Sequence, residues 1–339
     1  MTFNKGQQEI YSYSELTILT AEKEIIKAYR EAYNKIKSEL QKLYLKMQET
    51  GVPPQEYYNY MTKFKRLEAL QDGVYIAYQQ AYLAQKNIRI NTQYNIMREV
   101  YYRQQYLMLW PKESNRIFAL LPDGIVDTAV MGTAETWKQI YNKYGNIADY
   151  VPKSNTLTKL LLDNKTKELS KIQQTLTSSF IRGQSYKKTA NELKSVFNGS
   201  INNAMIIANT EGTRVMNAAA LANTNIAKVQ GLKIGRTWRA SFINNNDSRH
   251  QQYDGQIEDK NGMFHINGET GPYPGNLNSA GQNANCKCTI INIVEGIEPQ
   301  LRRGINPETG EEELISFDSY IKYMDGQRMK YTQKGWVKK

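Results

Sequence analysis

The stretch AEKEIIKAYREAYNKIKSELQKLYLKMQE, from Ala21 to Glu49, decides the fold class of the first part of this 339-residue chain. Its apolar side chains recur at alternating spacings of three and four residues, which places them in one stripe on a helix. These residues are Ile26, Tyr29, Tyr33, Ile36, Leu40, Leu43 and Met47. The following TGVPP, Thr50 to Pro54, combines a glycine with prolines just beyond it, a pattern that ends helices.

A second helical pattern runs from about Gln55 to Trp110, and the segment NIRINTQ (Asn87–Gln93) is a candidate break within it. Two long helices joined by a short turn form an antiparallel hairpin. Most of the 24 tyrosines lie in this half of the chain. Because they fall at helical spacing beside Leu and Ile, they favour packing between helices over stacking on nucleic-acid bases.

Glycines divide the middle of the chain into further helical segments. A short helix is predicted at AETWKQIYNKYG (134–145), and three more patterns end at Gly183, Gly199 and Gly231. Ser and Gly bound each of the three, as helix caps require. The two shorter patterns around Gly183 also resemble a DNA-binding helix-turn-helix, although short capped helix pairs are far commoner than recognition helices.

After Gly231 the pattern changes from helical to extended. RTWRASF (236–242) alternates Trp238, Ala240 and Phe242 with polar residues, the period of a half-buried strand. Loops follow, with short strands at QIED, MFHI and CTIINIV, and a short helix is predicted at SFDSYIKYM (316–324). We therefore expect an α+β protein: a long helical N-terminal hairpin or bundle, followed by helices and a small, loop-rich β module.

The expected division of the chain follows from these patterns. It consists of a helical arm (1–125), a connecting segment (126–155), a domain containing the β module (156–296) and a C-terminal tail (297–339). An apolar fraction of 40% and a charged fraction of 23% are typical of a folded protein. No membrane span or signal-peptide core is visible, and two cysteines do not make a disulfide framework, so we expect a reducing compartment such as the cytoplasm.

The formal charge of +11 favours polyanions, either nucleic acid or an acidic protein surface. Along the sequence the basic residues are scattered, so a face of solvated lysines explains the charge equally well.

Both cysteines lie in NANCKCTI (283–290), and both histidines lie within forty residues upstream. On a strand, Cys286 and Cys288 would face the same side, about 6.6 Å apart, and a disulfide across one residue is strained. Together with His250 and His265 they would form a Cys2His2 set suited to tetrahedral zinc, in which Asp247 or Asp254 could replace one histidine. Zinc-binding cysteines normally stand further apart. Two buried thiols, with His250 bonded to a backbone group, are the alternative.

The other polar residues of the module look architectural. Arg236 and Arg239 flank Trp238 and could pair with Asp247 or Asp254, holding a loop to the sheet. The chain shows no phosphate-binding glycine loop, nucleophile elbow or paired-histidine helical motif.

The motifs IANTEGTRVMNAAA, RTWRASF, DSRHQQYDGQ, MFHINGETGPYPG and NCKCT follow one another in this order. Their order and spacing resemble those of the phage Mu F-like minor head proteins, the phage head morphogenesis family, over about Leu157 to Val294. The chain departs from the family pattern in having Asn209 for an arginine and a short loop before His250. The residues that carry the resemblance are Thr210, Glu211, Trp238, Arg239, His250, Asp254, Gly255, Gln256, Phe264, Gly268, Tyr273, Pro274, Gly275, Asn285, Cys286 and Cys288, and Asp247 joins the structural motif.

The resemblance implies a non-enzymatic, low-copy structural protein of the phage head, located in the virion and, during assembly, in the host cytoplasm. Its implied partners are the portal, scaffold or major capsid protein, and non-specific DNA, which some relatives accompany on ejection. The alternative is a metal-dependent nuclease or toxin-like effector delivered with the genome, centred on His250, Asp254 and the cysteines.

Overall fold

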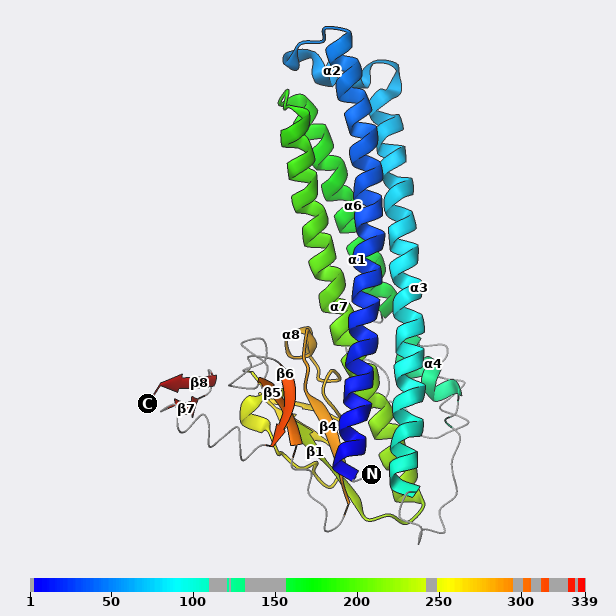
Figure 1. The fold of residues 1–339 in the computed structure, drawn as a ribbon, viewed down its shortest axis with the longest axis vertical. Coiled ribbons are helices and arrows are strands. Elements are labelled where there is room, and N and C mark those ends of the chain that lie inside the picture. Colours follow the sequence, from blue (N-terminus) through cyan, green and yellow to red (C-terminus); the bar gives the residue numbers. More distant parts are fainter. Residues whose placement is uncertain are drawn as a thin grey trace. The chain divides into compact units, whose positions relative to one another are not determined.

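The computed structural model describes residues 3–109, 121, 123–131, 157–241, 249–294, 301–305, 312–316, 329–332 and 335–338. Long helices come first and short strands follow, so the predicted α+β class is confirmed (Figure 1). The long helices are α1 (Phe3–Glu49), α3 (Arg66–Leu109), α6 (Leu157–Ile181) and α7 (Tyr186–Val229). Shorter helical elements are η1 (Pro54–Glu56), α2 (Tyr57–Thr62), η2 (Lys63–Lys65), α4 (Asp123–Met131), η4 (Gln251–Tyr253) and α8 (Ala280–Asn283).

The strands pair as antiparallel ribbons within the described ranges. The pairs are β1 (Ile234–Arg239) with β4 (Thr289–Val294), β2 (Phe264–Ile266) with β3 (Glu269–Gly271), β5 (Leu301–Ile305) with β6 (Glu312–Ser316) and β7 (Met329–Thr332) with β8 (Gly335–Lys338). Asn267 and Gly268 join β2 to β3 with φ angles of 50° and 79°. Both angles are positive, as a two-residue hairpin turn between twisted strands requires.

The chain divides into two compact units that are each discontinuous in sequence. Unit 1 contains residues 1–18, 91–157 and 207–339, and unit 2 contains residues 19–90 and 158–206. Among the described helices, none combines the length and the apolar character needed to cross a membrane.

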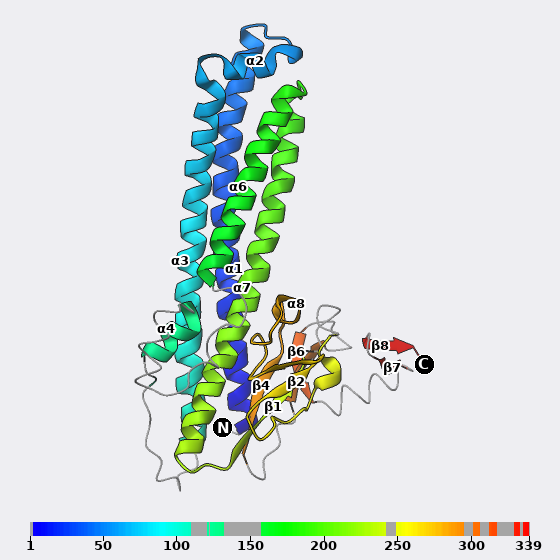
Figure 2. The same ribbon diagram turned by 180° about the vertical axis from the view of Figure 1, so that it is seen from behind.

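Unit 2 is a bundle of four helix segments, taken from α1, α3, α6 and α7, which lie side by side in both views (Figures 1 and 2). Aromatic rings fill its interior. The ring of Tyr44 stacks on Phe180 at 5.7 Å, and Tyr29 meets Tyr78 edge-on at 5.8 Å. Tyrosines at helical spacing therefore pack between helices, as predicted.

The stripe on α1 is buried largely as expected. Tyr29, Ile36, Leu40 and Met47 are all at most 3% exposed. Towards its two ends the buried stripe differs from the predicted one. Ile25 and Tyr44 are buried there, whereas the predicted Ile26 and Leu43 are only half-buried. A helix of 3.6 residues per turn drifts against a strict seven-residue repeat, and this drift moves the buried face by one position.

Three glycines end long helices in the same way. At Gly51, Gly183 and Gly231 the φ angle is between 60° and 82°. In each case the next residue donates its N–H to a carbonyl five positions back; Val52, for example, bonds to Met47. This is the Schellman arrangement, which only a left-handed residue permits. The helix ends predicted at Gly51, Gly183 and Gly231 are confirmed.

Three expected helix boundaries differ from the structure. Gly199 lies inside α7, where Ser200 does not begin a new helix but bonds back to the carbonyl of Val196. The predicted break at NIRINTQ is also absent, since α3 runs through it, and α3 begins at Arg66 rather than near Gln55. Buried apolar residues continue on either side of Gly199 and of NIRINTQ, so tertiary packing outweighs the local helix-ending signal there.

In unit 1, residues 207–229 of α7 run beside the strands. Thr224 Oγ1 lies 2.6 Å from Asn292 Oδ1 on β4, and the hydroxyl of Tyr11, on α1, donates to the carbonyl of Ile290 at 2.6 Å. The strand predicted over 236–242 ends at Arg239 as β1, and Thr237 and Ser241 are buried rather than solvent-facing. Residues 255–258 run along β1: the N–H of Trp238 donates to the carbonyl of Gln256, and the N–H of Glu258 donates to the carbonyl of Arg236.

Three predictions lie outside the described residues: the helix at 134–145, most of the helix at 316–324, and the role of Asp247.

Candidate metal centre

His250, Cys286 and Cys288 form a compact group of possible metal ligands in unit 1. Their ligand atoms all lie within 4.8 Å of one another. The Nδ1 atom of His250 is 3.4 Å from Cys286 Sγ and 3.6 Å from Cys288 Sγ. All three side chains are at most 1% exposed. The structure thus brings together three of the four residues predicted as zinc ligands.

The cysteines are positioned by the turn that precedes β4. They lie before that strand rather than within it, yet both still face His250. Asn285 adopts a φ of 54°, and its N–H donates to Thr210 Oγ1 of α7 at 2.7 Å. Asn is one of the few residues that adopt this left-handed conformation readily. Asn217 of α7 donates to the carbonyl of Cys288 at 3.0 Å, which ties this segment to the helix.

The imidazole of His250 is oriented by a side chain on the short helix α8. Its Nε2 lies 2.8 Å from Gln282 Oε1, and Asn267 Nδ2 donates to the same oxygen at 3.1 Å. An amide oxygen accepts hydrogen bonds, so the ring proton is on Nε2 and the lone pair of Nδ1 faces the two thiols. The partner of His250 Nε2 is therefore a side chain.

Aromatic rings enclose the group. Trp238 meets His250 edge-on, with ring centroids 5.6 Å apart, and Phe264 lies 5.5 Å from Trp238. Trp238 and Phe264 are both fully buried. The local environment of the two thiols is therefore apolar and closed.

His265, the fourth predicted ligand, lies elsewhere. Its Nε2 is 2.9 Å from Asp259 Oδ2, and its side chain is 63% exposed. Backbone N–H donation from Met263, and then the His265 side chain, lower the pKa of Asp259. His265 thus takes part in a surface pair with Asp259 and does not join the buried group.

The predicted arginine contacts are correct for one residue and wrong for the other. Arg239 pairs with Asp254 at 3.6 Å, and the same carboxylate accepts from the N–H of Ala240. Asp254 therefore holds the loop to β1 and does not face the cysteines. Arg236 instead pairs with Glu258 at 2.5 Å, because residues 255–258 run directly along β1.

One face of α7 contacts most of the family-like motifs. Glu211 and Arg214 form a buried ion pair at 2.9 Å, and both side chains are at most 2% exposed. Burial lowers the pKa of Arg214, but Glu211 and Tyr273 together outweigh it and the net shift of the pKa is upward. Although Asn209 stands in the family's arginine position, Glu211 still has an ion-pair partner.

The turn residues of the motif fit against this face. Gly275 has a φ of 88°, and a Cβ atom there would lie 2.9 Å from the Cβ of Arg214. Asn217 donates to the carbonyl of Pro274 at 3.1 Å, and Tyr273 is fully buried. Gly255, with a φ of 82°, donates to the carbonyl of Trp238.

Sequence reasoning missed Arg214, Asn217 and Gln282 as parts of this site. Arg214 and Asn217 lie in the quoted motif IANTEGTRVMNAAA, at positions three and six after Glu211. Their helical spacing from Thr210 and Glu211 was the available signal, since residues three, four and seven apart share a helix face.

Comparison with known proteins places this site inside a matched region. Residues 170–291 match the family model described as Phage Mu protein F like protein. The chain is 25% identical to Minor head protein GP7 of Bacillus phage SPP1 over 332 residues, which cover 96% of this chain and 98% of GP7. It is also 27% identical over 164 residues to NAD(+)--arginine ADP-ribosyltransferase EFV of Enterococcus faecalis (strain ATCC 700802 / V583), covering 48% of this chain and 33% of that protein.

No solved structure matches the chain. The family match spans α7, β1 and both cysteines, and so includes the three buried ligand residues and the α7 face that supports them. The order of motifs, the matched model and the full-length likeness to GP7 agree with one another: over residues 170–291 the chain is similar to the phage Mu F-like head morphogenesis family.

Proposed function

We propose that the protein is a minor structural component of a tailed-phage head that joins the particle during assembly in the host cytoplasm. The observation that carries this proposal is the extent of the likeness to Minor head protein GP7, which covers 96% of this chain and 98% of GP7. A match over nearly the whole of both chains includes the helical unit as well as the family domain. The likeness to the ADP-ribosyltransferase covers only 33% of that enzyme and does not support enzymatic activity here.

The buried group of His250, Cys286 and Cys288 supports a structural role over the alternative of a metal-dependent nuclease or effector. Catalysis at a metal requires an open position that substrate or water can reach. Here every ligand side chain is at most 1% exposed, and Trp238 lies against His250. Purified protein incubated with Mg²⁺, Mn²⁺ or Zn²⁺ and with single- and double-stranded DNA should release no nucleotides. Metal-dependent cleavage that is lost in His250→Ala would favour the alternative.

We assign the contact with portal, scaffold or major capsid protein to residues 57–66 of unit 2. Phe64 is 76% exposed, and both Phe64 and Lys65 have φ angles of 58°. Non-glycine residues rarely adopt such angles, and strain of this kind gathers at binding sites. The charged groups of Lys63 and Arg66 lie 5.4 and 5.1 Å from the centre of the Phe64 ring. An exposed aromatic ring flanked by cations suits an apolar pocket with an acidic rim.

Incorporation into particles tests the proposal. In the phage that encodes the chain, mass spectrometry should detect the protein in purified procapsids and virions. Phe64→Asp should lower its copy number per particle at least tenfold without changing its solubility. Leu45→Asp is the matched control, because Leu45 is 49% exposed on the same unit but lies outside residues 57–66.

The two outcomes that count against the proposal are distinct. Absence of the wild-type protein from procapsids and virions contradicts the head role itself. Normal incorporation of Phe64→Asp contradicts only the assigned contact surface. Cross-linking from residue 64 in intact procapsids then identifies the partner as portal, scaffold or major capsid protein.

The charge of unit 2 supports a further contact with packaged DNA. Unit 2 contains 20 Lys and Arg against 11 Asp and Glu, a formal charge of +9, whereas unit 1 contains 24 against 22, or +2. The excess of positive over negative charge is thus concentrated in one unit. Charge of this kind binds phosphates without reading base sequence.

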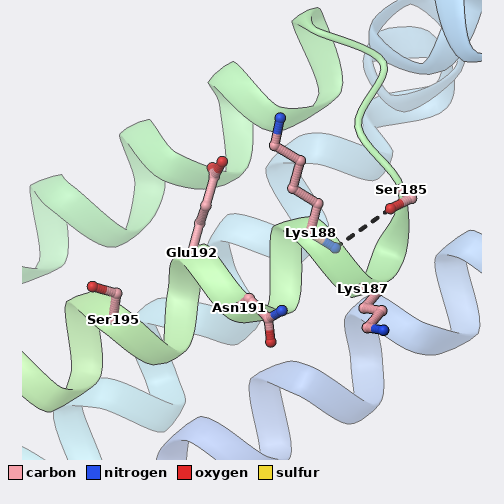
Figure 3. A pocket seen from close by; sticks show the side chains of 6 residues that line it. All are labelled: Ser185, Lys187, Lys188, Asn191, Glu192 and Ser195. Atoms are coloured by element: carbon pink, nitrogen blue, oxygen red, sulfur yellow. Dashed lines mark hydrogen bonds between the residues drawn. The ribbon is translucent and has the colours of Figure 1, made fainter.

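Several exposed lysines of unit 2 lie on α6 and at the start of α7: Lys167, Lys171, Lys187, Lys188 and Lys194. Figure 3 shows the start of α7, where Lys187 and Lys188 line an open hollow together with Ser185 and Asn191. Ser185 accepts a hydrogen bond from the N–H of Lys188 at 3.4 Å and so caps the helix. Lysines in a first turn oppose the helix dipole, and an anion beside them offsets that cost.

A further inference from the structure

We propose that Cys286, Cys288 and the Nδ1 atom of His250 bind one zinc ion, and that this ion holds the loop before η4 to the segment that enters β4. The proposal differs from the set predicted from sequence, because His265 is not a ligand and Gln282 acquires a role.

The first support is the distance between ligand atoms. Zinc bonds of about 2.3 Å to sulfur and 2.0–2.1 Å to nitrogen, at a tetrahedral angle, place a sulfur and a nitrogen ligand about 3.6 Å apart. The distances from His250 Nδ1 to the two sulfurs are 3.4 and 3.6 Å. Each cysteine sulfur therefore already has the separation from the imidazole nitrogen that a shared tetrahedral ion requires, and the three ligand atoms lie within 4.8 Å of one another.

The second support is the number of lone pairs. Nδ1 of a neutral imidazole has one lone pair, which can accept one S–H proton. Two sulfurs lie at nearly equal distances from it, at 3.4 and 3.6 Å. A hydrogen bond accounts for one of these contacts, whereas a cation shared by the nitrogen and both thiolates accounts for the two together.

The third support is the orientation of the imidazole by its other nitrogen. Metal-bound histidines usually donate their remaining ring N–H to an oxygen, which fixes the tautomer and raises the basicity of the ligand atom. Gln282 Oε1 occupies this position, 2.8 Å from His250 Nε2. Ser279 Oγ accepts a hydrogen bond from the backbone N–H of Gln282 at 3.3 Å and so caps α8. This cap helps to place Gln282, whose side chain orients the imidazole of His250.

The chemistry of the ligands selects the ion. Two thiolates and an imidazole favour zinc over magnesium or calcium, which prefer oxygen ligands. Among the residues that the structure describes, no fourth thiol, imidazole or carboxylate joins the group, so the protein supplies three identified ligands.

At this position the ion would stabilise the folded β module. The strands beside it are short: β2 and β3 have three residues each. A module with so little regular pairing gains folding free energy from metal binding, because the unfolded chain has no preformed site.

The decisive experiment measures zinc per chain, by elemental mass spectrometry, in full-length protein purified without added metal. Wild type should contain about one zinc ion per chain, and Cys286→Ser with Cys288→Ser should contain less than a tenth of that. His265→Ala is the matched control: it removes the exposed histidine of the same module and should leave the zinc content unchanged. Wild-type protein without zinc, which also fails to bind added zinc after reduction, overturns the proposal.

A second measurement covers the case in which the double variant does not fold. Wild-type protein stripped of metal and titrated with Co²⁺ should develop a thiolate-to-cobalt absorption band and the intense visible bands of tetrahedral cobalt. Gln282→Leu retains all three ligands and should weaken cobalt binding about 10- to 100-fold. Absence of a thiolate band in wild type, or unchanged affinity in Gln282→Leu together with zinc loss in His265→Ala, would contradict the assigned ligand set.

Discussion

At Gly275 the backbone passes so close to α7 that a side chain has no room. Its φ is 88°, and a Cβ atom would lie 2.9 Å from Arg214 Cβ and 3.0 Å from Arg214 Cα. Gly268 has a similar φ of 79° but no atom within 4 Å of its Cβ position. Comparing Gly275 with Gly268 therefore separates two ways in which an added side chain destabilises the fold, namely backbone strain and steric overlap.

We predict that Gly275→Ala destabilises the protein more than Gly268→Ala does. Strain at positive φ should cost about 1 kcal/mol at either position. Overlap with Arg214 at Gly275 should add about 1–3 kcal/mol, as overpacking does elsewhere. Urea unfolding followed by tryptophan fluorescence, to which the buried Trp238 contributes, provides the measurement. Equal losses for the two variants would show that α7 moves away at no cost.

Tyr11 carries a pH dependence that can be tested. Burial raises its pKa to about 12, and its hydroxyl donates to the carbonyl of Ile290. A pKa raised by folding contributes stability that is fully present below the unfolded value, about 10, and is lost as the pH rises towards 12.

Between pH 9 and 11.5 the urea midpoint of wild type should therefore fall more steeply than that of Tyr11→Phe, which has no proton to lose at this position. Other titrating groups are common to both proteins and cancel in the comparison. Parallel curves for the two proteins would mean that the Tyr11 hydroxyl is already accessible in the folded state.

Residue types indicated the buried group of His250, Cys286 and Cys288 better than they indicated the residues that support it. Cysteine and histidine are rare in this chain, so their concentration in one window is visible in the sequence. Gln282 and Asn217 are common residue types whose side-chain partners lie 15 to 73 residues away. Nothing local marks such contacts, because the fold alone brings the two ends together.

At the scale of elements, glycine illustrates what local sequence decides and what it does not. Gly51 is followed by Val-Pro-Pro, and proline cannot continue a helix, so the end of α1 is readable from sequence. Gly199 is followed by a run with buried Ala204 and Ala208, and the helix passes through it. Whether the helix ends at such a glycine depends here on the packing of the turns that follow, which the residues next to the glycine do not reveal.

The buried stripe of α1 predicts the behaviour of a double variant. Ile36 and Leu40 are 2% and 0% exposed within unit 2. Replacing both by Asp buries two carboxylates without partners, which should cost more than about 4 kcal/mol and disrupt the bundle. Hydrogen exchange should rise across residues 158–206 while residues 234–294 remain protected.

The control places the same introduced residue, Asp, on an exposed face of the same helix. Lys37→Asp with Gln41→Asp alters exposed positions at the same spacing of four residues. This variant should keep the protection of both regions. Loss of protection in residues 234–294 in the Ile36 and Leu40 variant would contradict an independent β module.

At the scale of the whole molecule, the charge difference between the units predicts the character of DNA binding. Affinity for a duplex should be independent of sequence and should fall steeply with salt, because neutralised phosphates release their counterions. Lys187→Gln with Lys188→Gln should reduce the slope of log K against log [salt] by about 2. Fluorescence anisotropy with two unrelated duplexes at 50 to 200 mM salt gives the measurement.

The matched control is Lys233→Gln with Lys260→Gln, which removes two exposed lysines from unit 1. It should leave the slope almost unchanged. Tight binding that survives high salt would indicate base readout instead, and no binding at low salt would assign the charge of unit 2 to a protein partner.

The contact between Tyr11 and Ile290 joins positions 279 residues apart, and this separation has a consequence for synthesis on the ribosome. Unit 2 is complete in sequence once Ile206 has emerged, whereas unit 1 must wait for β4, which ends at Val294. At translation rates of about 5–20 residues per second, the 88 intervening residues take about 4–18 s. During that interval the hydroxyl of Tyr11 on α1 lacks its acceptor at Ile290, and the nascent chain holds a finished bundle together with an unfinished module.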